Sequence, residues 1–147
     1  MQRKVAAALV AALALALASC GGSEQTETVS KAQAISRLEA ACLAGQHEAE
    51  RQLRRGREPF DYVKAILANM KTIDGKIGNL EPTGAARASF DAYKATLPPR
   101  IRVLEGIVSA DRGDQYRALV AARPEIARDG AKAHDAIARF GSRHICV

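Results

Sequence analysis

The sequence lacks the features of a large or membrane-spanning protein. It has no tryptophan and only three tyrosines, three phenylalanines and three cysteines in 147 residues. Its longest apolar run, Val5–Leu17, has 13 residues, whereas a transmembrane helix needs about 18 or more. The chain is long enough for one hydrophobic core but too short for two, so a multidomain enzyme is excluded.

Recognisable catalytic motifs are also missing. The sequence contains no G-x-S-x-G, no H-E-x-x-H, no glycine-rich phosphate loop and no paired carboxylates beside a nucleophile. Lys and Arg number 22 against 16 Asp and Glu. Two of these cations, Arg3 and Lys4, belong to a basic N-terminal segment, so the rest of the chain carries a mild excess of +4. We therefore expect a protein that is not an enzyme.

The N-terminus has the order of a secretory signal. Two positive charges in Met1–Lys4 precede the apolar run Val5–Leu17, and the small residues Ala18 and Ser19 follow. This order of charge, apolar core and small residues is typical of a cleavable signal peptide. The sequence therefore predicts export and removal of residues 1–19.

The residues Leu17-Ala18-Ser19-Cys20 resemble the lipobox of bacterial lipoproteins at every position. The resemblance implies that the Cys20 thiol receives a diacylglyceryl group, with acyl chains such as palmitate, and that cleavage occurs before Cys20. An ordinary cleavable signal with a chance cysteine is the alternative. Because Gly21 rather than Asp follows, the resemblance implies no retention in an inner membrane. The expected location is extracytoplasmic, on the outer face of the cell membrane or in the outer membrane of a two-membrane cell.

A polar segment separates Cys20 from the rest of the chain. Gly21–Thr28 has no aliphatic residue, which is typical of a flexible tether. We assign residues 20–29 to the lipidated cysteine and tether, and 30–147 to one helical domain. A tether of this length spans roughly 15 Å, so the domain would sit close to the membrane.

Two cysteines remain once Cys20 is lipidated. In an exported protein an even pair favours a disulfide, so we expect a bridge between Cys42 and Cys146, with two free thiols as the alternative. The bridge would close a loop of about 100 residues, worth up to ~4.7 kcal/mol. The two cysteines lie 104 positions apart without a C-x-x-C, a pattern that resembles neither a redox motif nor a zinc site.

Apolar periodicity predicts an all-α, antiparallel, up-and-down four-helix bundle. The first helix covers Ser30–Arg55, with Ser30 as N-cap and Gly56 as a left-handed exit. The second covers residues 60–80 and has the most apolar face in the chain. The layout of an early cysteine, four helices and a closing Gly-x-x-x-x-Cys also looks like small secreted proteins of high-GC bacteria, a resemblance that implies no function.

The third and fourth helices are expected over residues 85–110 and 115–140. The third is kinked or split at Pro98-Pro99, and the fourth is bent at Pro124 and ends at Gly141. The expected apolar stripes are, in chain order, Ile35, Leu38, Cys42, Gly45, Ala49 and Leu53; Phe60, Val63, Leu67, Met70, Ile77 and Leu80; Ala88, Ala92, Leu97, Ile101, Leu104 and Val108; and Tyr116, Leu119, Ile126, Ala133, Ile137 and Phe140.

Some residues have the chemistry of metal or haem ligands. His47 and Glu50 form an H-x-x-E pair at a spacing that allows both to reach one ion. Bundle metal sites draw further ligands from other helices, and Glu105 and His134 are too scattered to supply them. Met70 with a histidine would suit haem, but it lies on the strongest apolar stripe. We interpret the pair as solvated and Met70 as core, and we expect no metal or cofactor.

A basic cluster, Arg51, Arg54, Arg55 and Arg57, lies at the end of the first predicted helix. Export makes nucleic acid an unexpected partner. Two interpretations remain: a solvated helix end, where cations favour the dipole, or a face for anionic lipid headgroups or an acidic envelope polymer.

Taken together, these patterns predict a non-enzymatic, lipid-anchored envelope protein that binds another macromolecule or has a structural role. The alternative is a bundle that binds a metal, haem or small apolar ligand for uptake or sensing. A sealed interior of Ala, Leu, Ile and Phe would support the first, and a cavity lined by His47, Met70 or His134 the second.

Overall fold

The computed structural model describes residues 25–56 and 60–142 of the chain. These residues are predominantly helical, which confirms the all-α class at that level. Within them no helix is both long and apolar enough to cross a membrane. The elements, in order, are β1 (Glu27–Val29), α1 (Lys31–Arg55), α2 (Asp61–Ile77), β2 (Leu80–Pro82), α3 (Ala86–Lys94), α4 (Leu97–Ser109) and α5 (Gln115–Phe140).

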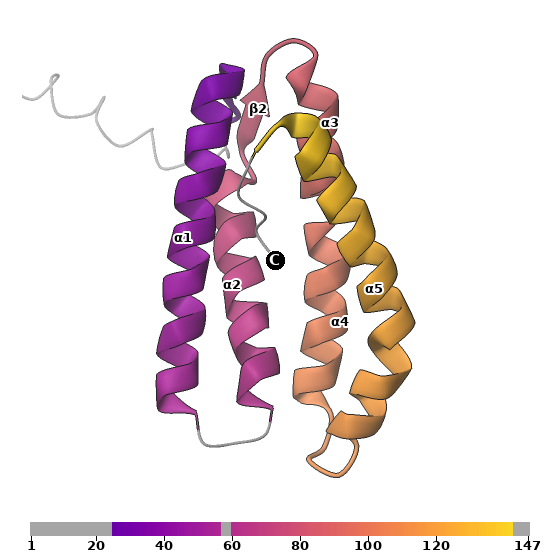
Figure 1. Cartoon of the computed structure of the whole chain (residues 1–147). Helices are drawn as coiled ribbons and strands as arrows, with labels where there is room; N and C mark the ends of the chain where they lie inside the picture. The colour runs from indigo at the N-terminus through magenta and orange to yellow at the C-terminus, as the bar shows by residue number, and fades with distance from the viewer. Residues whose placement is uncertain (1–24, 57–59, 143–147) are drawn as a thin grey trace, which may run out of the picture.

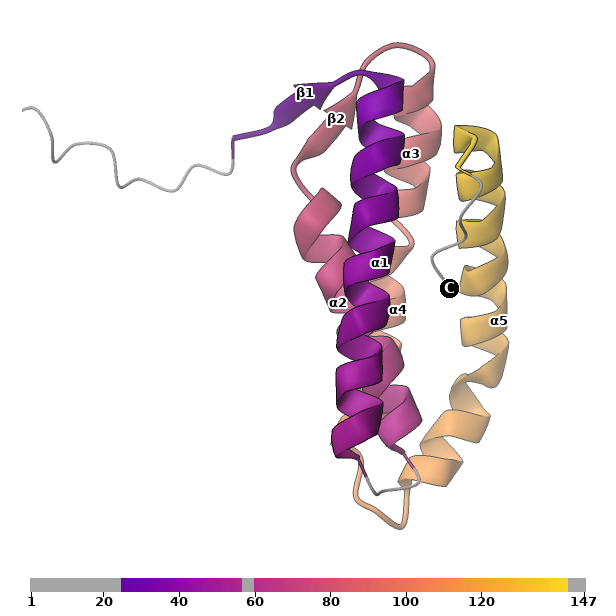
Figure 2. The same ribbon diagram turned by 60° about the vertical axis from the view of Figure 1, so that its left-hand side comes forward.

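The long helices lie side by side along one axis (Figures 1 and 2). α1 packs along α2, α2 contacts α4, and α3 and α4 follow each other along α5. β1 and β2 lie at the end of the molecule where α1 begins, and α1 and α4 both finish at the opposite end (Figure 1). The N-terminal side of the described chain is therefore separated from the end of α1 by the length of that helix.

Ser30 is the N-cap of α1, as the sequence predicts, and the structure adds a capping box with Gln33. The Ser30 hydroxyl accepts a hydrogen bond from the Gln33 amide at 3.2 Å, and the Gln33 side chain accepts one from the Ser30 amide at 2.9 Å. The predicted exit at Gly56 was wrong in its geometry, because Gly56 has an extended backbone (φ −77°, ψ 146°) rather than a left-handed one. A side chain there would overlap the Asp61 carboxylate, so glycine allows α2 to begin close to the end of α1.

The second helix is shorter than predicted. α2 ends at Ile77, and Leu80 instead begins β2, which pairs in parallel with β1. The Glu27 amide donates to the Asn79 carbonyl at 2.8 Å, and the Thr83 amide donates to the Val29 carbonyl at 2.9 Å. The segment assigned to the tether therefore contributes its last three residues, 27–29, to the folded unit.

The third predicted helix is split, as the proline pair indicates. α3 and α4 are separated at Ala95 and Thr96, and the two prolines occupy the first turn of α4, where their missing amide protons are tolerated. The buried face of α3 differs from the prediction. It consists of Phe90 and Tyr93 rather than the alanines of the expected stripe, which are exposed at positions 88 and 92.

α5 contains Pro124 and ends at Gly141, as the sequence predicts, and Gly141 has a left-handed backbone with a φ of 89°. Its ribbon bends in the orange, N-terminal part (Figure 2), where the proline removes one backbone hydrogen bond. Tyr116 is 71% exposed and does not belong to the core, so that member of the predicted stripe was wrong.

The core consists of two apolar clusters. The larger lies towards the strands and joins α1, α2, α3 and α5; in it the rings of Phe90 and Phe140 meet at 5.0 Å between centroids. The smaller lies towards the opposite end and joins α2 to α4, with partly buried residues of α5 against it. Its buried members are Val63, Leu67, Met70, Leu104 and Ile107.

Candidate functional site

A cavity of about 310 Å³ lies beside the smaller core cluster, between α2, α4 and α5. Its walls are mostly apolar, and its polar lining residues are Arg100, Glu125 and Asp129. Tyr62, which is 64% exposed, stands at its rim. The remaining lining residues are Val63, Ile66, Met70, Val103, Leu104, Leu119 and Ile126.

α5 contains a proline beside this space. Pro124 precedes the lining residues Glu125 and Ile126, and Leu119 lies before it. A proline inside a helix tilts the two halves relative to each other. The side chains that α5 contributes on both sides of the bend are only partly buried against the core cluster. The cavity therefore lies along the part of α5 that contains Pro124.

Arg100 is the cation of the cavity wall. Burial lowers the pKa of its guanidinium, while neighbouring Tyr93 and Asp129 act in the opposite direction. A guanidinium has five N–H donors, yet Arg100 makes no hydrogen bond or ion pair with any other residue that the structure describes. It is a partly buried cation beside an apolar space.

Asp129 is buried, but its charge is already compensated. Its Oδ1 lies 3.4 Å from both the Arg128 Nε and the Lys132 Nζ. Burial raises the pKa of Asp129, but the hydrogen bonds from Lys132 and Arg128 outweigh that effect and hold it below its usual value. The carboxylate is therefore ionised at neutral pH and directed towards α5's own cations.

Tyr93 is 1% exposed, and its hydroxyl finds no hydrogen-bond partner among the described residues. Burial raises the pKa of Tyr93 to about 12, an effect that Arg100 reduces. A buried hydroxyl without a partner costs about 1–3 kcal/mol. The hydroxyl is therefore neutral and destabilising at physiological pH.

We expect Tyr93→Phe to raise the free energy of unfolding by about 1 kcal/mol at pH 7, because it removes this unsatisfied hydroxyl. Between pH 10 and about pH 12 the unfolded chain loses the tyrosine proton while the folded chain keeps it. The wild type should lose a further 2–3 kcal/mol or so over this window relative to the variant. Urea unfolding of both proteins across pH 7–12 measures the difference, and Tyr116→Phe, at an exposed position, serves as control. A Tyr93→Phe variant less stable than the wild type would contradict this account.

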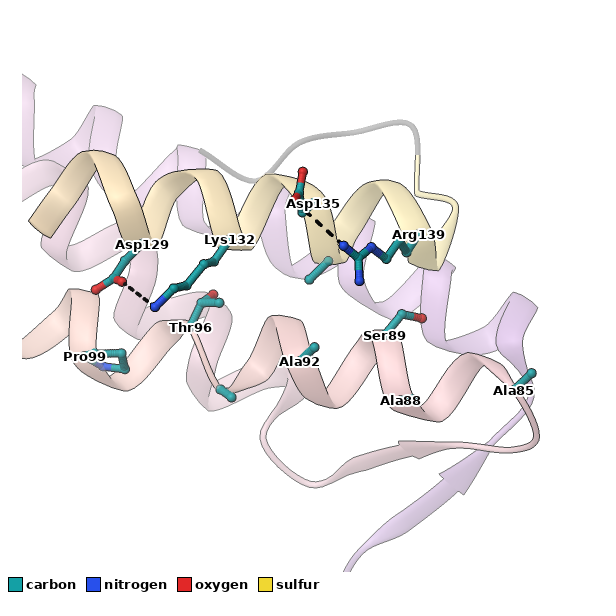
Figure 3. Close-up of a pocket in the computed structure, with 12 residues that line it drawn as sticks. Ala85, Ala88, Ser89, Ala92, Thr96, Pro99, Asp129, Lys132, Asp135 and Arg139 are labelled. Atoms are coloured by element: carbon teal, nitrogen blue, oxygen red, sulfur yellow. Dashed lines mark hydrogen bonds and ion pairs between the residues drawn. The ribbon is translucent and has the colours of Figure 1, made fainter.

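A second, open groove of about 700 Å³ runs between α3, the start of α4 and α5 (Figure 3). Its α3 side carries Ala85, Ala88, Ser89 and Ala92, whose short side chains leave the space between the helices unfilled. The charged residues on its α5 side pair with each other, Asp129 with Lys132 at 3.4 Å and Asp135 with Arg139 at 3.9 Å. The groove therefore presents no uncompensated charge or deep apolar surface to a ligand.

Of the three cysteines, the structure describes only Cys42. Cys42 is buried at 5% exposure in the middle of α1. Cys20 and Cys146 lie outside the described residues, so lipidation and the disulfide stay predictions. The signal peptide, residues 1–19, also lies outside them.

The other ligand-type residues do not converge. His47 and Glu50 are exposed on α1, and His134 is exposed on α5. In the described part of the chain no three His, Cys, Asp or Glu side chains gather closely enough to hold a metal ion. Met70 is 6% exposed in the core, which confirms its interpretation as a core residue, and one side of it lines the cavity.

The basic cluster lies at the end of α1 that is remote from β1. Arg51, Arg54 and Arg55 are exposed, while Arg57 falls outside the described residues. Arg51 pairs with Glu48 and Arg54 pairs with Glu50 at 3.4 Å. Hydrogen bonds from Gln52 and Arg51 lower the pKa of Glu48. Two of the described arginines are thus partly neutralised within the helix.

Comparison with known proteins identifies no relative: no family model, no curated protein and no solved structure matches this chain. The cavity and the residues at its polar end are therefore the observations from which a function can be argued.

Proposed function

We propose that this protein is a lipid-anchored, extracytoplasmic binding protein without catalytic activity, whose helical domain holds a small apolar ligand for uptake or sensing. The observation that carries the proposal is the apolar cavity between α2, α4 and α5, with Met70 in its wall. Pockets of about 300–1,000 Å³ with apolar walls and a few polar groups are typical ligand sites. A cavity in contact with Met70 is the feature that favours a ligand-binding bundle over a sealed interaction module.

We infer further that the domain is an antiparallel, up-and-down four-helix bundle in which α3 and α4 together form the third arm. The succession of contacts α1 with α2, α2 with α4, and α3 and α4 with α5 supports this arrangement. In such bundles, ligand sites lie between facing helices. The cavity has that position.

The test is binding of 8,8,8-trifluorooctanol, followed by fluorine NMR with the protein as purified from its host, in lipid nanodiscs. Burial of about seven methylene groups at ~0.8 kcal/mol each gives an expected dissociation constant near 100 µM. Val103→Trp fills the cavity and should abolish binding. Val120→Trp places the same side chain at an exposed position of α5 outside the cavity and should leave binding unchanged. Equal signals from protein-loaded and empty nanodiscs would refute the proposal.

The exposed arginines at the end of α1 favour a second candidate, binding of an anionic macromolecule. With 25 residues, α1 extends about 37 Å, so these arginines lie far from the end of the domain that carries the tether. This distance favours an acidic envelope polymer over the headgroups of the membrane that holds the anchor.

A further inference from the structure

We propose that the cavity selects an aliphatic monocarboxylate of about eight to ten carbon atoms, with its chain among the apolar side chains and its carboxylate at Arg100. This inference rests on the proposed function, because it names the ligand class of the same cavity. It is carried by three observations: the volume of the cavity, the placement of its charges, and the guanidinium donors of Arg100, which no described residue satisfies.

The volume limits the size of the ligand. Each water molecule occupies about 30 Å³ in the liquid, so 310 Å³ corresponds to roughly ten to twelve non-hydrogen atoms. One acyl chain of medium length fits this space. A phospholipid with two long chains does not, so the source of the carboxylate is a free acid rather than a membrane lipid.

The charged side chains at the polar end of the cavity have a net charge of +1. The cations are Arg100, Arg128 and Lys132, and the carboxylates are Asp129 and Glu125. Arg128 contacts Asp129 at 3.4 Å and Glu125 at 3.9 Å, and Lys132 contacts Asp129 at 3.4 Å. Both carboxylates therefore have cations from α5, whereas Arg100 on α4, although Asp129 acts on it electrostatically, forms no ion pair or hydrogen bond with a residue that the structure describes. A ligand with one negative charge complements this balance.

Arg100 also has the geometry that a carboxylate requires. The planar guanidinium presents pairs of parallel N–H donors that match the two carboxylate oxygens. Arg100 is half-buried, and no described residue satisfies these donors. Binding an anion therefore lowers its free energy more than it would that of an exposed arginine. An alcohol or alkane of the same length would fill the apolar part of the cavity but leave this gain unrealised.

The experiment compares 8,8,8-trifluorooctanoate with 8,8,8-trifluorooctanol on the same protein in nanodiscs at pH 7.5. The carboxylate should bind at least tenfold more tightly in the wild type, after subtraction of its partition into empty nanodiscs. Arg100→Gln should remove that preference and leave alcohol binding within about twofold. Arg102→Gln changes an exposed arginine two residues away that does not line the cavity, and it should keep the preference.

The possible outcomes separate this inference from the proposed function. If neither probe binds, the cavity is not a ligand site and both fail. If the alcohol binds as tightly as the carboxylate, or if Arg100→Gln keeps the preference, the cavity is a ligand site but the carboxylate assignment is overturned. Thermal unfolding of each variant without ligand confirms that a loss of binding is not a loss of folding.

Discussion

Cys20→Ser is expected to move the protein entirely from the membrane fraction to the soluble fraction. Each methylene of a buried acyl chain contributes about 0.8 kcal/mol, so two or three chains hold a protein firmly where one chain gives only marginal binding. A serine at this position has no thiol to receive the diacylglyceryl group, and none of the helices among residues 25–56 and 60–142 is long and apolar enough to cross a membrane. Fractionation of cells and intact mass of the isolated protein measure the outcome.

Ser19→Ala is the matched control for the anchor, because it keeps a small residue beside Cys20. It should retain both the membrane association and the mass increment of the acyl groups. Membrane association of Cys20→Ser at the wild-type level, with an unchanged mass, would contradict the lipoprotein proposal. It would not affect the proposal about the cavity.

Loss of the Cys42–Cys146 bridge is expected to have the largest effect on stability, about 2–4 kcal/mol and a fall in melting temperature of roughly 10 °C. The end of α5 lies at the start of α1, since a side chain on Gly141 would come within 3.4 Å of the Lys31 ammonium. Cys42 is eleven residues further along α1, about 16 Å away. Five residues from Gly141 to Cys146 reach about as far when extended, so the chain is long enough for the bridge.

Cys146→Ala isolates the bridge, because it leaves the buried Cys42 side chain in its packing. Its melting temperature should match that of reduced wild type, and reductant should have no effect on the variant. Rapid alkylation of both Cys42 and Cys146 in the unreduced protein would contradict the bridge.

The features of the fold that the sequence predicts correctly are set by neighbouring residues. The N-cap at Ser30, the break at Pro98-Pro99 and the helix end at Gly141 each depend on residues within a few positions. Such features can be identified from a short window of sequence, because their energetics do not require knowledge of the rest of the fold.

The features that sequence reasoning missed depend on distant parts of the chain. β1 and β2 have three residues each and pair across more than fifty positions, so neither shows an alternating pattern. The buried face of α3 is set by contact with α5, where Phe90 meets Phe140. The alanine stripe at positions 88 and 92 has helical spacing too, and only the position of α5 decides which stripe is buried.

The candidate site was predictable only at Met70. Its apolar environment was evident from the spacing of α2, but the cavity beside it is lined by side chains from three helices at once. Arg100 is one of 22 cations in the sequence, so nothing local distinguishes it. Tyr93 was not a member of the apolar stripe expected over residues 85–110.

The pairing of β1 with β2 determines which elements would first bear a tensile force applied at the N-terminal side of the domain. Tension along an anchored chain would first load two strands that lie parallel, held at their ends by the hydrogen bonds from Glu27 to Asn79 and from Thr83 to Val29. Behind them, the Lys94 ammonium donates to the Gly78 and Leu80 carbonyls at 3.1 and 3.0 Å and so ties this junction to α3. In an anchored chain, force would therefore pass into α2 and α3 before it reached the first turn of α1, and we expect the strand pair to resist it.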